Sequence, residues 1–191
     1  LTPMGDNGCE PIGSMVNDAP LAVLSDQAPL LFWYFKQVFA QVSNPPLDAI
    51  REELVTSVET FIGSEGNLFD QTPLQSAQLK LKTPILTNAE LEKIRSLNSG
   101  NLKAKTLSSV FRPTDGRGSL KNAIESLRKE AGDAVQQGHT ILILSDRAAD
   151  AEHAPIPSLL AVSSVHHHLI RQGTRTKVGL VVESGEPRDV G

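Results

Sequence analysis

The chain has 191 residues, a formal net charge of −4, 39% hydrophobic residues and 21% charged residues. This composition is typical of a globular protein of one sizeable domain and excludes a disordered tail. The lysines and arginines are scattered, without the basic stripe that a phosphate backbone requires, so we expect no nucleic-acid partner.

Apolar runs and cysteines limit the cellular setting. The longest apolar runs, 30–35 and 140–144, are far shorter than the ~20 residues that span a bilayer, so we expect no membrane contact. No signal peptide is recognisable at the start. The lone Cys9 can form neither an internal disulfide nor an iron–sulfur cluster. We expect a reduced, cytoplasmic protein. Because the chain begins without Met and stops after an apolar strand and a polar turn, we also expect a piece of a longer chain.

Residues 1–28 are rich in glycine and proline and are predicted to be an irregular loop region. Residues 29–100 are predicted to be mainly helical. A first helix should end before Pro45 and Pro46, and a second should begin at Pro46, giving two packed helices joined by a rigid elbow. The apolar faces consist of Leu31, Phe35, Val38, Phe39 and Val42, and of Leu47, Ile50, Leu54, Val58 and Ile62.

A third, short helix is indicated after a polar connection at 64–86. Thr87 and Glu90 have the spacing of a capping box, in which each side chain satisfies the backbone of the other. The helix that follows carries Leu91, Ile94 and Leu97 on its apolar face.

Residues 101–191 alternate between strand and helix patterns. The expected order is a strand within 102–111, a helix capped by Ser119, a buried strand at 140–144, a helix at 158–171 and a second buried strand at 177–182. This βαβαβ pattern predicts a parallel sheet with right-handed crossovers. Three strands cannot close a barrel, so the sheet must end open or be covered by another part of the protein.

The candidates for chemistry are weak. Three successive histidines, His166 to His168, point about 100° apart on a helix and cannot converge on one metal ion, although one of them could join His153. The glycine-rich run 114–119 is interpreted as a tight turn, with an anion site as the alternative. Cys9 is interpreted as an incidental loop thiol, with a hydrolytic nucleophile as the alternative.

Polar residues also follow the two buried strands, where ligands bind in parallel α/β folds. Asp146 and Glu183 could pair as acid and base, and Arg147 could hold a carboxylate. Since no third catalytic group is evident, we expect these residues to cap the strand ends. The alternative is a free-standing module that binds small molecules there.

Several long runs resemble one family over the whole chain and in the right order. They are 10–15, 18–26, 35–46, 51–55, 62–68, 143–158 and 181–186. All of them are similar to the central domain of the glutamate synthase large chain, in both its ferredoxin-dependent and its NAD(P)H-dependent forms. The resemblance implies an α/β fold like a rudimentary, truncated TIM barrel, with the helical hairpin packed on the short parallel sheet.

The resemblance also implies a function. Glutamate synthase is an oxidoreductase that converts glutamine and 2-oxoglutarate into two glutamates. Its amidotransferase domain releases ammonia, and its FMN-binding domain, which carries a [3Fe–4S] cluster, uses that ammonia. The central domain connects these two partners and contributes neither catalytic residues nor cofactor sites. The enzyme's location would be the cytoplasm, or the plastid stroma in a photosynthetic eukaryote. An isolated segment would expose apolar surface, which favours self-association.

By the same resemblance, Met15, Ser43 and Asn44 line part of an internal ammonia path. A flexible, apolar Met side chain suits a narrow bore, while a hydroxyl and an amide can hydrogen-bond to passing ammonia. Ser43 stands where the family commonly has threonine, and Val16 stands where it usually has glycine. The second departure makes the loop at Met15 stiffer than the family pattern.

Overall fold

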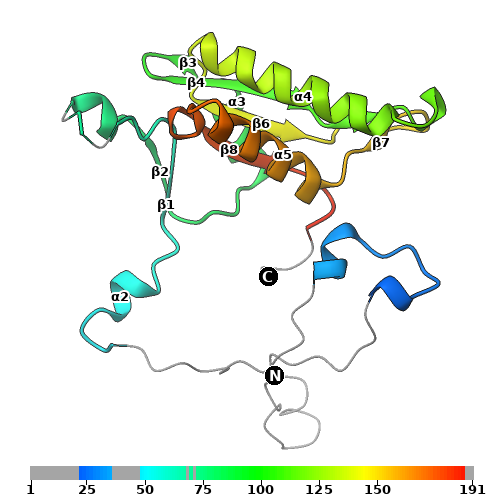
Figure 1. The fold of residues 1–191 in the computed structure, drawn as a ribbon. Helices are drawn as coiled ribbons and strands as arrows, with labels where there is room; N and C mark the ends of the chain where they lie inside the picture. The colour runs from blue at the N-terminus through cyan, green and yellow to red at the C-terminus, as the bar shows by residue number, and fades with distance from the viewer. Residues whose placement is uncertain (1–21, 36–47, 68, 71, 188–191) are drawn as a thin grey trace, which may run out of the picture. The chain divides into compact units, whose positions relative to one another are not determined.

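The computed structural model describes residues 22–35, 48–67, 69–70 and 72–187 (Figure 1). Contacts divide the chain into two compact units, residues 1–57 and 58–191. None of the described helices is long and apolar enough to cross a membrane.

The described part of the first unit contains short helical turns. They are the 3-10 helices η1 (Ala22–Leu24) and η2 (Leu31–Phe35) and the α-helix α2 (Glu52–Val55). The predicted first helix is present as η2 as far as Phe35, and its later residues, like the elbow at 44–46, lie outside the described residues. The predicted second helix is wrong, because α2 has only four residues and both Ile50 and Leu54 are exposed.

The reason lies in the residues that follow α2. Residues 56–62 read Thr-Ser-Val-Glu-Thr-Phe-Ile, and β-branched and aromatic side chains lose rotamer freedom in a helix but pack well in a strand. Strand β1 (Thr60–Ile62) accordingly pairs antiparallel with β2 (Leu79–Leu81). The predicted helical face at Ile62 is therefore part of a β-hairpin in the second unit.

A mixed sheet forms the centre of the second unit. Its strand order is β3 (Asn98–Ser99), β4 (Leu102–Ser108), β6 (Ile141–Ser145) and β8 (Gly179–Glu183). Strands β4, β6 and β8 are parallel, which confirms the predicted βαβαβ arrangement, and β3 is antiparallel to β4. The strand predicted at 177–182 starts at Gly179 and is only partly buried, because it lies at the sheet edge.

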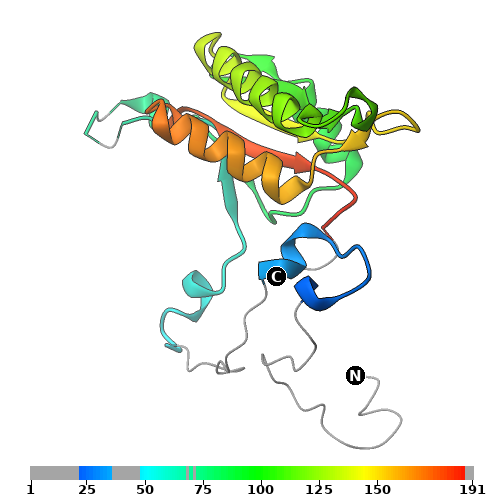
Figure 2. The same cartoon turned by 45° about the vertical axis from the view of Figure 1, so that its right-hand side comes forward.

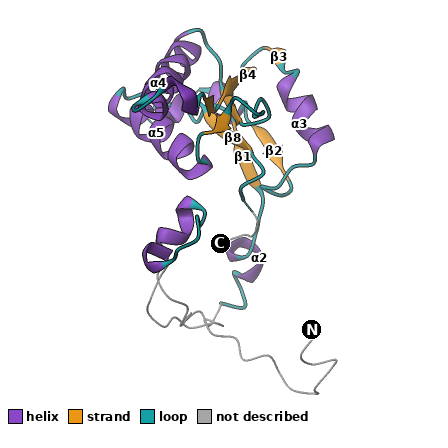
Figure 3. Cartoon of the chain, turned by 90° about the vertical axis from the view of Figure 1, so that its right-hand side faces the viewer, coloured by secondary structure: helices purple, strands orange, loops and turns teal. Residues whose placement is uncertain are grey.

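Both faces of the sheet are covered (Figure 3). Helices α4 (Ser119–Gln136) and α5 (Ser158–Arg171) lie side by side on one face, as Figure 2 also shows, and α3 (Asn88–Arg95) lies on the other. Leu142 and Leu144 of β6 pack toward α4 and α5, whereas Ile141 and Ile143 pack with residues of α3 and β1. This double burial explains why β6 is a continuous apolar run.

The helices of the second unit agree with most of the sequence predictions. The capping box of α3 is present, with Thr87 accepting from the Glu90 amide and Glu90 accepting from the Thr87 amide. The predicted inner face of α4 is buried at Ile124, Leu127, Ala131, Ala134 and Val135. The prediction that Ser119 caps α4 is wrong, since Gly118 occupies that position with a φ of +104° and no side chain caps the helix.

Short elements complete the second unit. Strands β5 (Val110–Phe111) and β7 (Ala154–Pro155) pair antiparallel beyond the ends of β4 and β6. The remaining 3-10 turns are η3 (Pro73–Ser76), η4 (Pro113–Asp115) and η5 (Arg175–Lys177). The fold is thus α/β, as predicted. Its likeness to a truncated TIM barrel is not confirmed, because among the described strands β8 pairs with β6 alone and the sheet stays open.

Candidate functional site

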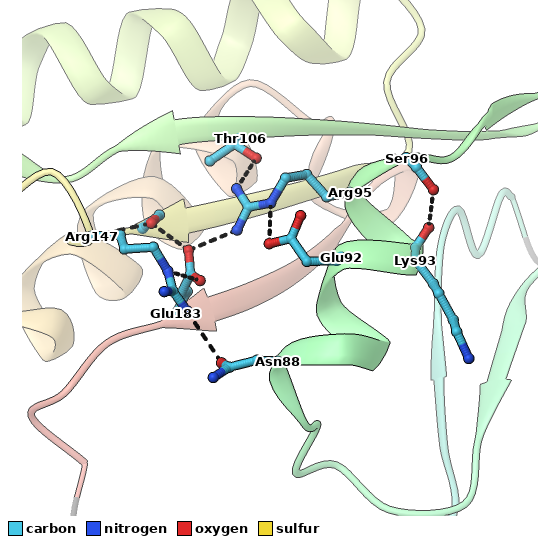
Figure 4. Close-up of polar contacts among 9 residues, drawn as sticks. Asn88, Glu92, Lys93, Arg95, Ser96, Thr106, Arg147 and Glu183 are labelled. Carbon is cyan, nitrogen blue, oxygen red and sulfur yellow. Dashed lines mark hydrogen bonds and ion pairs between the residues drawn. The ribbon is translucent and has the colours of Figure 1, made fainter.

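The carboxyl ends of β6 and β8 bring together the polar residues that the sequence singles out (Figure 4). Ser145 ends β6 and Glu183 ends β8 directly beside it, because these two residues are register partners. Arg147 follows β6 in the chain, and Arg95 comes from the last turn of α3. Three segments that are distant in sequence therefore meet at one end of the sheet.

Glu183 is the centre of this cluster. Its Oε2 accepts hydrogen bonds from the Ser145 hydroxyl at 2.5 Å and from Arg95 Nη2 at 2.9 Å. Its Oε1 accepts one from Arg147 Nε at 2.6 Å. The Glu183 side chain is only 9% exposed, whereas that of Arg147 is 60% exposed. Both carboxylate oxygens thus accept hydrogen bonds from partners inside the protein.

The electrostatics follow from this geometry. Burial by itself would raise the pKa of Glu183, but hydrogen bonds from Ser145, Arg95 and Arg147 outweigh it and lower the pKa to about 2. The same contact raises the pKa of Arg95. Glu183 therefore stays ionised at neutral pH and is too weak a base to accept a proton from a substrate.

Further contacts tie the cluster to α3. Arg95 also donates to the Thr106 hydroxyl at 2.8 Å and to Glu92 at 3.2 Å, and Arg147 donates to Asn88 at 3.2 Å (Figure 4). Asn88 and Arg95 are the two ends of α3, so these bonds fix that helix across the ends of β4, β6 and β8. The arrangement is a structural clamp, and we call Glu183, Ser145, Arg95 and Arg147 the strand-end clamp.

The structure gives Asp146 a different partner from the one considered in the sequence. Its Oδ2 accepts from the Ser184 hydroxyl at 2.6 Å, while Glu183 is occupied by the clamp. The three residues Asp146, Arg147 and Glu183 do lie at the same end of the sheet. Their side chains, however, are bound by each other or by neighbours, which does not resemble an acid–base pair.

Sequence reasoning missed Arg95 and Asn88, and it noted Ser145 at the end of the strand without giving it a role. Arg95 was recognisable only as a basic residue near a helix end, where it also suits the helix dipole. Its contact with Glu183 joins residues 88 positions apart and depends on how α3 crosses the sheet. No local sequence pattern carries that information.

The histidines have several different partners. His166 Nδ1 accepts from Arg175 Nε at 3.0 Å, and the rings of His166 and His167 meet edge to face at 5.1 Å. His153 pairs instead with Asp150 at 2.8 Å. Within the described residues, no group of three or more His, Cys, Asp or Glu side chains could hold a metal ion.

Two of the surface cavities lined by described residues lie away from the clamp. One, of about 810 Å³, is lined by residues of the 64–77 segment and by Asn101, Lys103 and Thr140 near the starts of β4 and β6. The other, of about 320 Å³, lies between α4 and α5. Among the described residues, the buried Arg128 Nε and His168 Nε2 at this second cavity have no hydrogen-bond partner. Burial, with Arg128 and Arg171 nearby, lowers the pKa of His168.

Most of the remaining predicted residues belong to parts of the chain that the structure does not describe. Met15, Ser43 and Asn44, which the resemblance assigns to an ammonia path, lie outside the described residues, and so does Cys9. The glycine-rich run at 114–118 is the expected turn, with positive φ at Gly116 and Gly118.

Comparison with known proteins decides the family. All of residues 1–191 match the family described as the glutamate synthase central domain. The chain belongs to this family.

Relatives of the domain occur in several types of glutamate synthase. The chain is 47% identical over 190 residues to the glutamate synthase [NADPH] large chain of Bacillus subtilis. The aligned region covers 100% of this chain and 12% of that relative. It is 41% identical over 192 residues to the glutamate synthase [NADH] of Schizosaccharomyces pombe, with 100% of this chain and 9% of that relative covered. It is 44% identical over 186 residues to the chloroplastic ferredoxin-dependent glutamate synthase of Oryza sativa, with 96% of this chain and 11% of that relative covered. The chain thus spans about a tenth of the length of the curated relatives it matches.

Proposed function

We propose that this domain is a connecting part of a glutamate synthase large chain and performs no chemistry of its own. In this proposal it links the amidotransferase domain to the FMN-binding domain and lines part of the path that ammonia takes between them. The observation that carries the proposal is the match to the family over residues 1–191, within relatives about ten times longer.

The strand-end clamp supports the non-catalytic part of the proposal. The strand ends are where an α/β enzyme would hold its reactive groups. Here the buried carboxylate of Glu183 accepts from three donors, and its pKa of about 2 makes it unsuitable as a general base. Its role is to hold α3 against the sheet.

The parent enzyme's chemistry belongs to other domains in this proposal. Glutamine and 2-oxoglutarate would be bound there, together with FMN and the [3Fe–4S] cluster. The relative names include NADPH-dependent, NADH-dependent and ferredoxin-dependent enzymes, so the domain is compatible with each type of electron donor. The parent would act in the cytoplasm, or in the plastid stroma, as the name of the rice relative suggests.

The conducting role rests on Met15, Ser43 and Asn44. Ammonia that met bulk water would be protonated to ammonium, so the path between the two catalytic domains has to exclude water. An apolar, flexible Met15 side chain would narrow the bore, and the hydroxyl of Ser43 and the amide of Asn44 would offer hydrogen bonds to the passing molecule.

A bulky substitution tests this role in the full-length enzyme. With Met15→Trp we expect glutamine hydrolysis to continue while glutamine-dependent glutamate formation falls, because the indole blocks the path. Both products are measured in one assay. The matched control is Met4→Trp, the same change at the chain's other methionine. If Met15→Trp leaves the ratio of glutamate formed to glutamine hydrolysed at the control value, Met15 does not line the path.

A free-standing binding module is the alternative, and the structure gives it little support. Arg147 and Glu183, which would bind the ligand, bind each other at 2.6 Å. Titration of the 191-residue chain with 2-oxoglutarate, glutamine and FMN distinguishes the two functions. We expect no saturable binding at micromolar concentrations, and such binding would favour the module.

A further inference from the structure

The two edges of the central sheet differ in how they are protected. Along β4, β3 pairs with the start of the strand, and Ala104 N donates to Leu97 O at 3.0 Å. Lys103 and Lys105 add positive charge to the same strand. Short edge strands and lysines are the usual means of preventing further strand pairing. The β4 edge is therefore protected against pairing with a further strand.

The β8 edge has none of these features. Its sequence, Gly-Leu-Val-Val-Glu, contains no lysine or proline, and its register with β6 is continuous from Gly179 to Glu183, without a bulge. Among the described strands, β8 pairs with β6 only. An uninterrupted apolar strand at an edge is the type of edge that accepts another strand.

Hydrogen bonds show which backbone groups of β8 are free to pair. Gly179 N donates to Thr140 O, and Glu183 O accepts from Asp146 N, so both residues direct their polar groups toward β6. Because these directions alternate along a strand, the N–H and C=O groups of Leu180 and Val182 point to the open edge.

Apolar side chains continue this edge onto α5. Val182 is 41% exposed, and on α5 Leu159 and Ile170 are 40% and 49% exposed. Leu159 and Ile170 are eleven residues apart, which places them on the same side of the helix, within about 20°. The opposite flank carries His168, which lines the cavity shared with α4. The exposed pair is thus on the flank of α5 that α4 leaves uncovered.

We infer that β8 and this flank of α5 form a docking surface for a strand–helix segment of the same glutamate synthase chain, from the part outside residues 1–191. The inference rests on the proposed function, in which this domain belongs to a larger enzyme. The relatives contain many residues outside the matched region from which such a segment can come, since this chain covers only 9–12% of their length. A further right-handed unit would place a parallel strand against Leu180 and Val182 and a helix against Leu159 and Ile170.

Amide hydrogen exchange, compared between the 191-residue chain and the full-length enzyme, tests the inference. We expect the Leu180 and Val182 amides to exchange at least about 100-fold more slowly in the full-length enzyme, because they become hydrogen-bonded there. Gly179 and Val181 direct their amides toward β6 and should be protected in both samples, so they are the internal control.

Three outcomes would overturn the inference. Equal, fast exchange of Leu180 and Val182 in both samples would show that nothing docks on β8. Equal, slow exchange in both samples would show that residues 1–57 already cover the edge. Protection that grows with the concentration of the 191-residue chain would indicate a second copy as the occupant.

Substitutions provide a second, independent test. Val182→Lys and Ile170→Lys should lower the melting temperature of the full-length enzyme but not that of the 191-residue chain. The matched control is Ile85→Lys, an exposed isoleucine outside the surface that should be silent in both. Equal effects of all three changes in the full-length enzyme would contradict the inference. These readouts measure docking and not ammonia transfer. The docking inference can therefore fail while the Met15→Trp test supports the proposed function, and the Met15→Trp test can fail while docking is observed.

Discussion

Glu183 illustrates how one residue of this domain can resemble a catalytic group and be a structural one. Its position at the end of a parallel strand is where a catalytic carboxylate would be expected. Its partners argue against that role, because Ser145, Arg95 and Arg147 donate hydrogen bonds to its two oxygens and keep the group ionised. The sequence reveals the position, and the partners emerge only from the tertiary structure.

The clamp should contribute measurably to stability. Glu183→Gln keeps the shape of the side chain but removes the charge that pairs with Arg95 and Arg147. We expect a loss of about 2–3 kcal/mol in the free energy of unfolding, since hydrogen bonds to charged groups contribute ~1.5–3 kcal/mol. Urea unfolding of the 191-residue chain measures it. The control is Glu152→Gln, whose partner Arg112 is also exposed and whose loss should cost less than about 1 kcal/mol.

The clamp also predicts a pH dependence. The pKa of Glu183 is lowered in the folded state from its ordinary value of 4.5 to about 2, so the unfolded chain binds the proton more readily. The stabilisation is complete above about pH 4.5 and is lost as the pH falls toward 2. The difference in stability between the wild type and Glu183→Gln should therefore shrink over this range. A difference independent of pH would contradict the lowered pKa.

At the scale of the elements, close packing joins β8 to β1. A Cβ atom at Gly179 would lie 2.8 Å from the backbone nitrogen of Gly63 and 3.2 Å from Ile62 Cβ. The β1–β2 hairpin thus crosses the start of β8 at a distance that only glycine permits.

Gly179→Ala should therefore be destabilising. We expect a loss of about 1–3 kcal/mol, as is usual for overpacking, because the clash involves backbone that cannot turn away. The matched control is Gly185→Ala, where an added Cβ has no atom within 4 Å. Thermal unfolding of the two variants compares them, and equal stability would show that β1 moves away from β8 without cost.

Helix caps offer a second test at this scale. Thr87→Ala removes the hydroxyl of the capping box of α3 and should cost about 1 kcal/mol. Ser119→Ala should be nearly neutral, because Ser119 lies inside α4 and its side chain does not cap the helix. If Ser119→Ala is the more costly change in urea unfolding, the structure's assignment of the two helix starts is wrong.

The elements differ in how well sequence predicted them, for physical reasons. β6, α4 and α5 have strong periodic patterns backed by burial on both faces of the sheet, so 141–145, 119–136 and 158–171 agree closely with expectation. The stretch 47–62 has apolar residues at helical spacing, yet its β-branched second half joins a hairpin with residues 79–81. That pairing is non-local and overrides the pattern. In the clamp, Glu183 and Arg147 were identifiable, whereas Arg95 required the position of α3.

At the scale of the whole molecule, the family, the central sheet and the strand-end clamp are consistent with one another. The domain matches glutamate synthase over its entire length, its strand ends are closed by internal ion pairs, and its β8 edge is left unprotected. Exposed apolar side chains in the first unit, such as Val23, Leu24 and Phe35, also suit a segment that other domains cover. These features fit the connecting role that we propose for the domain.

The most direct measurement is turnover by the isolated domain. The 191-residue chain is incubated with glutamine, 2-oxoglutarate, FMN and a chemical reductant, and glutamate and ammonia are followed over time. The full-length enzyme is the positive control. The account predicts that the domain alone produces neither compound above the protein-free background. Sustained formation of either one, proportional to the amount of domain, would contradict it.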